Sequence, residues 1–160
     1  MRHFTVMFFN LVLILCGVTI CIAWEGKVVG ISDGDTITVL HEGRGEKIRL
    51  YGIDAPESHQ DFGKRAKQFV SNQVFGKIVE VDPITIDRYG RTVSMVVFGI
   101  GQNLSEELIT AGFAWVYGKY CTAKICRDWQ KKEQEARGQG AGLWSQANPI
   151  APWEFRKVKH

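Results

Sequence analysis

Short apolar runs rich in β-branched residues recur between residues 24 and 98, and turn-forming residues separate them. Such runs predict strands, because β-branched side chains pack well on a pleated, half-buried surface. Five strands are expected, at Lys27–Ser32, Thr36–Leu40, Glu46–Ile53, Ile78–Val81 and Thr92–Phe98. Asp33-Gly34-Asp35 follows the first strand and Asp87-Arg88-Tyr89-Gly90 precedes the last, and both segments have the composition of tight turns.

Apolar residues repeat with a helical period in three other segments. The predicted helices are Phe62–Phe75, Asn103–Ala111 and Thr122–Arg137. Five strands, with one helix before the fourth and two after the fifth, predict a mainly β fold with α: a five-stranded OB-type β-barrel plus three helices. Barrels of this type commonly bind oligonucleotides. The tail from Ser145 to His160 shows no period, and we expect it to be extended.

The first residues have the pattern of a secretory leader. Arg2 and His3 precede an uncharged apolar run, Val6–Ala23, which predicts a signal peptide over residues 1–23. An uncleaved anchor is the alternative, although the run is at the short end of what spans a bilayer. We expect a folded domain over residues 24–145 and a C-terminal tail over residues 146–160, either secreted or periplasmic.

Two of the four cysteines, Cys121 and Cys126, lie outside the leader. In an oxidising compartment an even pair this close in the chain predicts a local disulfide. A metal site is the weaker alternative, because no histidine is spaced to complete a tetrahedral zinc centre.

Acidic residues lie beside turns at two places in the predicted barrel, Asp33 with Asp35 and Asp54 with Glu57. Carboxylate oxygens without cysteine or histidine suit Ca²⁺ or Mg²⁺. Ordinary turn capping is the alternative for each aspartate. The formal net charge of +3 over 160 residues is too small for a binder that relies on charge alone to hold nucleic acid.

Two arginines accompany these acids. Arg49 lies within the third predicted strand and Arg91 follows a turn, and an arginine fork binds phosphate bidentately. Solvated surface positions are the alternative. In an ideal strand Arg49 and Asp54 point to opposite faces, because their separation is odd. Gly52 lies between them and offers a bulge that brings both side chains to one side.

The chain contains, in order, SDGDTITV, IRLYGIDAPES, DRYGR, NLSEELITAGFAWVY and GLW. Their order and spacing resemble those of the thermonuclease family, the secreted staphylococcal-nuclease-like enzymes, from about Gly26 to Trp144. The resemblance implies an OB-type barrel with three helices. It also implies cleavage of DNA and RNA phosphodiester bonds, usually with Ca²⁺ and with Mg²⁺ as the alternative, to give 3′-phosphate ends.

The resemblance also implies roles for individual residues. It places metal ligands at Asp35, Asp54 and the Ala55 carbonyl, catalytic groups at Arg49, Glu57 and Arg91, and substrate contacts at Arg88, Tyr89 and Tyr117. A barrel that only binds nucleic acid or protein is the rival, and the presence of all the acids and arginines favours an enzyme. We expect a monomer with DNA and RNA as substrates, no stable protein partner, and no membrane contact once the leader is cleaved. A basic tail on a membrane or partner is a further alternative to a solvated terminus.

Overall fold

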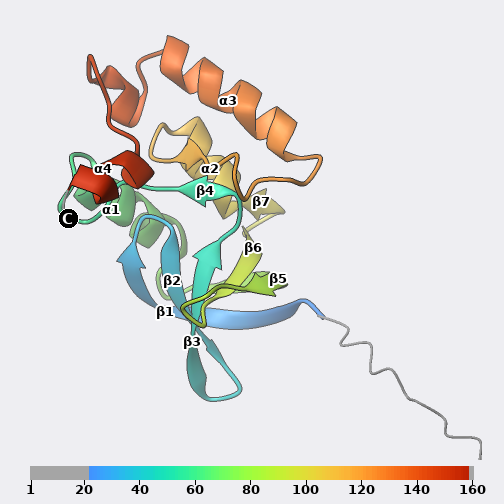
Figure 1. Cartoon of the computed structure of the whole chain (residues 1–160). Helices are drawn as coiled ribbons and strands as arrows, with labels where there is room; N and C mark the ends of the chain where they lie inside the picture. Colours follow the sequence, from blue (N-terminus) through green and yellow to red (C-terminus); the bar gives the residue numbers. More distant parts are fainter. Residues whose placement is uncertain (1–21, 159–160) are drawn as a thin grey trace, which may run out of the picture.

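The computed structural model describes residues 22–158, and Figure 1 shows strands below a layer of helices. The strands are β1 (Trp24–Asp33), β2 (Thr36–His41), β3 (Arg44–Leu50), β4 (Ile53–Asp54), β5 (Ile78–Ile86), β6 (Thr92–Phe98), β7 (Gln102–Asn103) and β8 (Trp115–Val116). The helices are α1 (Gly63–Val74), α2 (Leu104–Thr110), α3 (Cys126–Gly138) and α4 (Pro152–Val158), with a 3₁₀ helix, η1 (Gly142–Ser145), before α4.

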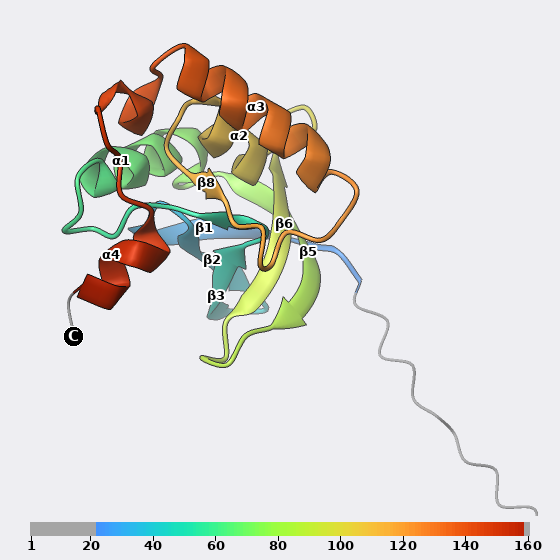
Figure 2. The same ribbon diagram turned by 45° about the horizontal axis from the view of Figure 1, so that its top comes forward.

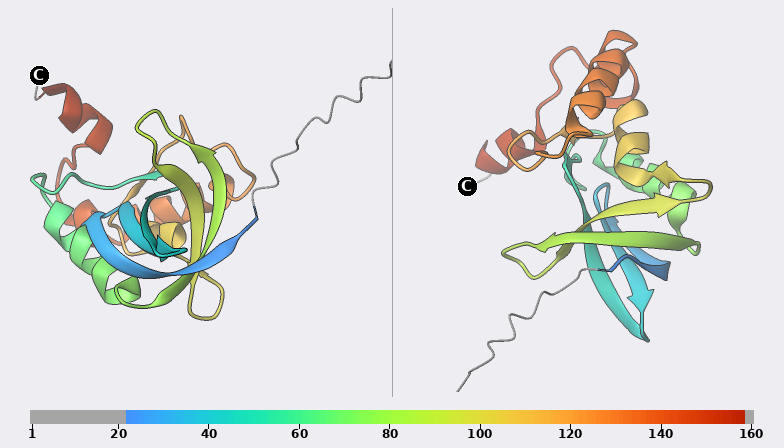
Figure 3. Two further views of the ribbon diagram at one scale, coloured as in Figure 1. Left: turned by 90° about the horizontal axis from the view of Figure 1, so that it is seen from below. Right: turned by 90° about the vertical axis from the view of Figure 1, so that its right-hand side faces the viewer.

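Five strands close into a barrel, seen end-on in the left panel of Figure 3. Consecutive antiparallel pairs give the order β3-β2-β1-β5-β6. The ring closes through parallel pairing of β3 with β6, in which Arg49 is opposite Val93. Both sides of β3 are therefore paired, which fixes the direction of its side chains. β4 and β8 form a separate two-stranded pair above the barrel.

The barrel interior is filled by the inward residues of the strands, all at most 1% exposed: Val28, Ile37, Val39, Ile48, Leu50, Val79, Val81 and Val96. Side chains alternate along a strand. Arg49, between the buried Ile48 and Leu50, consequently points out of the barrel on the side where the acidic residues lie.

Helices α2 and α3 cover one end of the barrel (Figure 2). The side chain of Asn103 accepts hydrogen bonds from the amides of Ser105 and Glu106 and so caps the start of α2. Trp129 of α3 is fully buried, and its indole N–H donates to Glu106 at 3.1 Å, which joins the two helices.

The predicted fold class, an OB-type barrel with five strands, is confirmed, and each predicted helix is present. Helix α3 begins four residues later than expected, since a disulfide between Cys121 and Cys126 closes the loop before it. Strand β5 runs past its predicted end through Pro83, where the pairing with β6 shifts register.

The expectation of an extended tail is wrong, because a fourth helix, α4, forms at Pro152–Val158. Proline suits the first turn of a helix, and Glu154 near the start and Lys157 near the end match the helix dipole. Seven residues are too few to show a helical period in the sequence. Residues 1–21 of the predicted leader and residues 159–160 of the tail lie outside the described residues. Within residues 22–158, no helix is long and apolar enough to span a bilayer.

Candidate functional site

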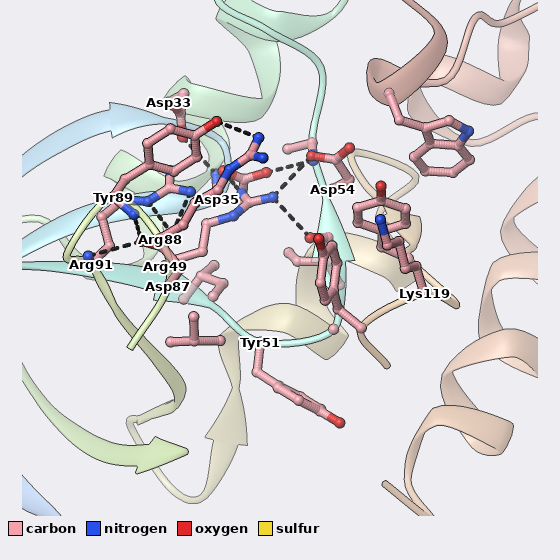
Figure 4. Close-up of a pocket in the computed structure, with 18 of the residues that line it drawn as sticks. Asp33, Asp35, Arg49, Tyr51, Asp54, Asp87, Arg88, Tyr89, Arg91 and Lys119 are labelled. Carbon is pink, nitrogen blue, oxygen red and sulfur yellow. Dashed lines mark hydrogen bonds and ion pairs between the residues drawn. The ribbon is translucent and has the colours of Figure 1, made fainter. Parts of the chain in front are cut away.

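Two buried carboxylates meet at one guanidinium group on the outer side of the barrel (Figure 4). Nη1 of Arg49 contacts Asp35, and Nη2 donates to Oδ1 of Asp54 at 2.9 Å. Asp35 is 5% exposed and Asp54 is 1% exposed. Burial lowers the pKa of the Arg49 guanidinium, and the charge of Asp54 opposes that effect. Because one planar group contacts both acids, the two carboxylates are close enough to act together.

A turn at Tyr51–Gly52 brings Arg49 and Asp54 to the same side. Gly52 has a φ of 73°, which ends β3 and starts the short strand β4. The amide of Tyr51 donates to the Ser94 carbonyl and the amide of Tyr117 donates to the Gly52 carbonyl, so both ends of the turn are held. The predicted bulge is a turn in the structure, and it has the expected effect on the two side chains.

Asp35 is positioned by the turn between β1 and β2. The Asp33 side chain accepts from the Asp35 amide at 3.2 Å, so Asp33 stabilises the turn. Oδ2 of Asp35 accepts from the Ala55 amide at 2.7 Å. This bond ties the first acidic turn to the residue that follows Asp54.

The tip of the β5–β6 hairpin carries the second predicted arginine. Nε of Arg91 donates to Asp87 at 2.7 Å, and the guanidinium lies 5.4 Å from the centre of the Tyr89 ring. The Arg88 guanidinium lies 4.7 Å from the same centre. The positive charge of Arg91 contributes to lowering the pKa of Arg49, so the two guanidinium groups lie close enough to influence each other.

Glu57 is paired with a residue that the sequence did not single out for this site. Oε1 of Glu57 accepts from Nη1 of Arg156 at 2.7 Å, and Nη2 of Arg156 donates to Oδ2 of Asp54 at 2.7 Å. Burial alone would lower the pKa of Arg156, but these hydrogen bonds outweigh it and the pKa is raised. The expectation of a solvated tail is therefore wrong for Arg156.

Tyr117 lies on the helical side of the site. Its ring stacks on Trp153 of α4, with centres 4.9 Å apart and planes 4° apart, and it meets Tyr120 edge-on. Aromatic side chains such as these are the platforms on which proteins stack the bases of single-stranded nucleic acid. In the free protein Trp153 covers one face of the Tyr117 ring.

These groups line one pocket of about 870 Å³. Figure 4 shows Arg49 between Asp35 and Asp54, with the hairpin residues on the Asp35 side and Lys119 beyond Asp54. Figure 3 shows the hairpin tip and α4 on the same side of the barrel. All the predicted site residues except the disulfide pair line this pocket.

The donor set fits a hard divalent cation. Asp35 and Asp54 are buried and offer only oxygen ligands. Within residues 22–158, no three acidic, histidine or cysteine side chains form a metal cluster. A cation held by these two aspartates would therefore need backbone, water or substrate oxygens to complete its shell.

Sequence reasoning missed two partners of the predicted residues, Asp87 and Arg156, and the contacts of Tyr51, which also lines the pocket. The Asp87–Arg91 contact had a local signal, an aspartate at the start of a turn. Tyr51 had none, since its hydroxyl accepts from the amides of Thr122 and Ala123, far along the chain. Burial alone would raise the pKa of Tyr51, but the hydrogen bonds with the Thr122 hydroxyl and with these two amides together outweigh it, and the pKa is lowered.

Comparison with known proteins adds an independent finding. The model of the family described as staphylococcal nuclease homologue matches residues 47–146. An Escherichia coli protein named as an uncharacterized endonuclease is 41% identical over 140 residues, 88% of this chain and 90% of that protein. The micrococcal nuclease of Shigella flexneri is 40% identical over 147 residues, 85% of this chain and 84% of its own length. A staphylococcal-like nuclease of Arabidopsis thaliana is 41% identical over 113 residues, 71% of this chain and 34% of the plant protein.

Proposed function

Because the chain belongs to the staphylococcal nuclease family and is a nuclease, we propose that it is a metal-dependent endonuclease with little sequence specificity. It hydrolyses DNA and RNA phosphodiester bonds and leaves 3′-phosphate ends. The observation that carries the proposal is the meeting of Asp35 and Asp54 at the Arg49 guanidinium, in a pocket that Arg91 and Glu57 also line.

Asp35, Asp54 and the Ala55 carbonyl would hold the cation, which is Ca²⁺ with Mg²⁺ as the alternative. When bound, a divalent cation supplies Lewis acidity and a fixed point for a phosphate oxygen. Arg49 and Arg91 bind the phosphate and stabilise the negative charge that grows on it during attack. Tyr117, Tyr89 and Arg88 contact the nucleotide.

Glu57 acts as the general base. It takes a proton from a water molecule as the water oxygen bonds to phosphorus in line with the 5′ oxygen. The phosphorus–O5′ bond breaks, the 5′ oxygen takes a proton from solvent, and the phosphate stays on the 3′ side. A general base supplies about 10² to 10⁴ in rate, whereas nucleases must supply a far larger acceleration. Charge stabilisation by the arginines and the bound cation must provide most of the remainder.

A cleavage assay with defined products tests this function. The purified protein is incubated with supercoiled plasmid and with single-stranded RNA, in Ca²⁺, in Mg²⁺ and in chelator, and the product ends are mapped. We expect nicking and degradation of both polymers with 3′-phosphate ends, and no cleavage in chelator. Tight binding of either polymer without cleavage in any metal would support the non-catalytic barrel instead.

We also propose that the enzyme works outside the cytoplasm, in the periplasm or beyond the cell. The Cys121–Cys126 disulfide supports this location, because such bonds persist in oxidising compartments. Mass spectrometry of the protein recovered from cell fractions is the test. We expect a chain that begins at Trp24 in the exported fraction, and a full-length chain in the membrane fraction would favour the uncleaved anchor.

A further inference from the structure

Helix α4 touches both halves of the candidate site. At one end of the site, Arg156 donates to Asp54 and Glu57, both at 2.7 Å. At the other end, Trp153 stacks on Tyr117 with centres 4.9 Å apart. The two residues lie one turn apart, on one face of the helix. The same short element therefore covers the carboxylates and the aromatic ring together.

The Arg156 contacts compete directly with a divalent cation. Oδ2 of Asp54 accepts from Arg156, while Oδ1 accepts from Arg49 at 2.9 Å and from Arg156 at 3.3 Å. Each oxygen of this carboxylate thus already accepts from a guanidinium group. A cation placed on Asp54 would also lie within a few ångströms of a guanidinium that cannot lose its proton, and like charges at that distance repel.

The same contacts restrain the general base and the aromatic platform. Oε1 of Glu57 is a weaker acceptor for a proton from water while it accepts from Arg156. A nucleobase cannot stack on the face of Tyr117 that the Trp153 ring covers. With α4 docked, Arg156 lies where the cation and the attacking water would approach Asp54 and Glu57, and Trp153 lies where a nucleobase would stack on Tyr117.

The attachment of α4 suits release. The helix has seven residues and lies at the end of the described chain, and the Arg156 side chain is 43% exposed. Val158, at the end of the helix, is 86% exposed. Among the described residues, the core cluster of the barrel contains no residue of α4. The helix packs through Trp153 on Tyr117 and Trp115, through Phe155 on His59 with ring centres 5.3 Å apart, and through the buried Pro152.

We propose that Arg156 is a further residue of this site that sets the cation requirement of the enzyme. It occupies the carboxylates in the free protein and must be displaced, with α4, when a divalent cation and nucleic acid bind. This proposal rests on the proposed nuclease function. It goes beyond that function in assigning an inhibitory role to a segment outside the barrel.

Calcium binding by the full chain tests the proposal without reference to turnover. Isothermal titration with Ca²⁺ is run on the wild type, on Arg156→Gln, and on Lys157→Gln as the matched control. Lys157 carries the same charge on the same helix but bonds to Glu154 at 2.8 Å. We expect the dissociation constant for Ca²⁺ to fall about tenfold in Arg156→Gln and to change little in Lys157→Gln.

A second measurement follows α4 in the unmodified protein. Hydrogen exchange of the peptide that contains α4 is compared without and with saturating Ca²⁺ and a single-stranded oligodeoxynucleotide. We expect exchange to become faster when both are present. Unchanged or slower exchange would overturn the proposal, because α4 would then stay docked over the occupied site.

The possible titration results separate the two proposals. Equal Ca²⁺ affinity in all three proteins, or an equal gain in both variants, overturns the role of Arg156 while the nuclease assignment stands if plasmid is cleaved. Weaker binding in Arg156→Gln also overturns it. If the wild type and Arg156→Gln both bind no Ca²⁺ and cleave no polymer in any metal, the proposed function fails together with this inference.

Discussion

Two arginines contact the same carboxylate, Asp54, from regions that are built very differently. Arg49 lies on a strand that is paired on both sides, between two residues that are at most 1% exposed. Arg156 lies on a seven-residue helix near the end of the chain. Their hydrogen bonds to Asp54 are similar in length, 2.9 and 2.7 Å.

Bond length therefore says little about how permanent each contact is. Hydrogen bonds on both sides of β3 hold the backbone of Arg49 in place. Arg156, by contrast, leaves the acids when only a terminal helix moves. We interpret the barrel side as the fixed part of the site and the α4 side as the exchangeable part. Four predictions test that division.

The largest difference is expected between Arg49→Ala and Arg156→Ala. Loss of Arg49 leaves Asp35 without its ion pair and Asp54 with only the exchangeable one, and breaking a buried pair in this way costs about 3 kcal/mol of unfolding free energy. Cleavage should also fall about 10³-fold. Loss of the half-exposed Arg156 should lower the unfolding free energy by no more than about 1 kcal/mol. Urea unfolding measures both, and equal losses would contradict the division.

Activity should respond strongly to two changes that spare the fold. Glu57→Gln removes the proposed proton acceptor and Arg91→Ala removes a proposed phosphate contact, and each should lower kcat/KM at least about 10²-fold. Circular dichroism and the thermal midpoint should stay close to those of the wild type. Near-normal cleavage by either folded variant would refute the role of that residue.

Gly52→Ala tests the turn that joins β3, which carries Arg49, to β4, which carries Asp54. Its φ of 73° disfavours a side chain, and an added Cβ would lie 2.6 Å from Sγ of Cys121 and 2.9 Å from the Trp129 ring. We expect a loss of about 2 kcal/mol in unfolding free energy. Gly90→Ala is the matched control, since it has a φ of 76° but no neighbour within 4 Å, and it should lose less.

The smallest effect is expected at Asp87. Burial raises its pKa, but hydrogen bonds from Arg91 and Tyr89 outweigh this and the pKa is lowered. The carboxylate therefore stabilises the folded state above its unfolded pKa, and this contribution is lost as the pH falls through the lower folded value. Asp87→Asn should cost under about 1 kcal/mol at pH 7, and the difference from wild type should shrink below about pH 4. A constant difference across this range would contradict the assignment.

Most of the barrel side could be predicted from the sequence. The strands carry β-branched runs and the turns carry Asp and Gly, so local chemistry and tertiary structure agree from Trp24 to Phe98. Gly52 in the sequence also predicted that the chain could turn between Arg49 and Asp54 and bring the two side chains together. The catalytic and ligand roles of these residues stay predictions until they are tested by mutation.

The α4 side could not be predicted in the same way. A seven-residue helix has too few positions to show a period. Pro149 before the helix and Pro152 at its first position favour the prediction of an extended segment. Arg156 meets Asp54 across 102 positions of the chain, and nothing local marks such a contact. The basic residues at the terminus resemble a solvated tail unless their distant partners are known.

The parallel pairing of β3 with β6 has a consequence for how the enzyme matures. Moving β3 by one residue would exchange Arg49 with a neighbouring apolar side chain, and hydrogen bonds on two sides resist that slip. Until β6 has been synthesised and has joined the ring, nothing holds that alignment from the second side. A chain in which β6 has not yet paired with β3 should therefore have no nuclease activity. Activity should appear in one late folding step, when this pairing forms.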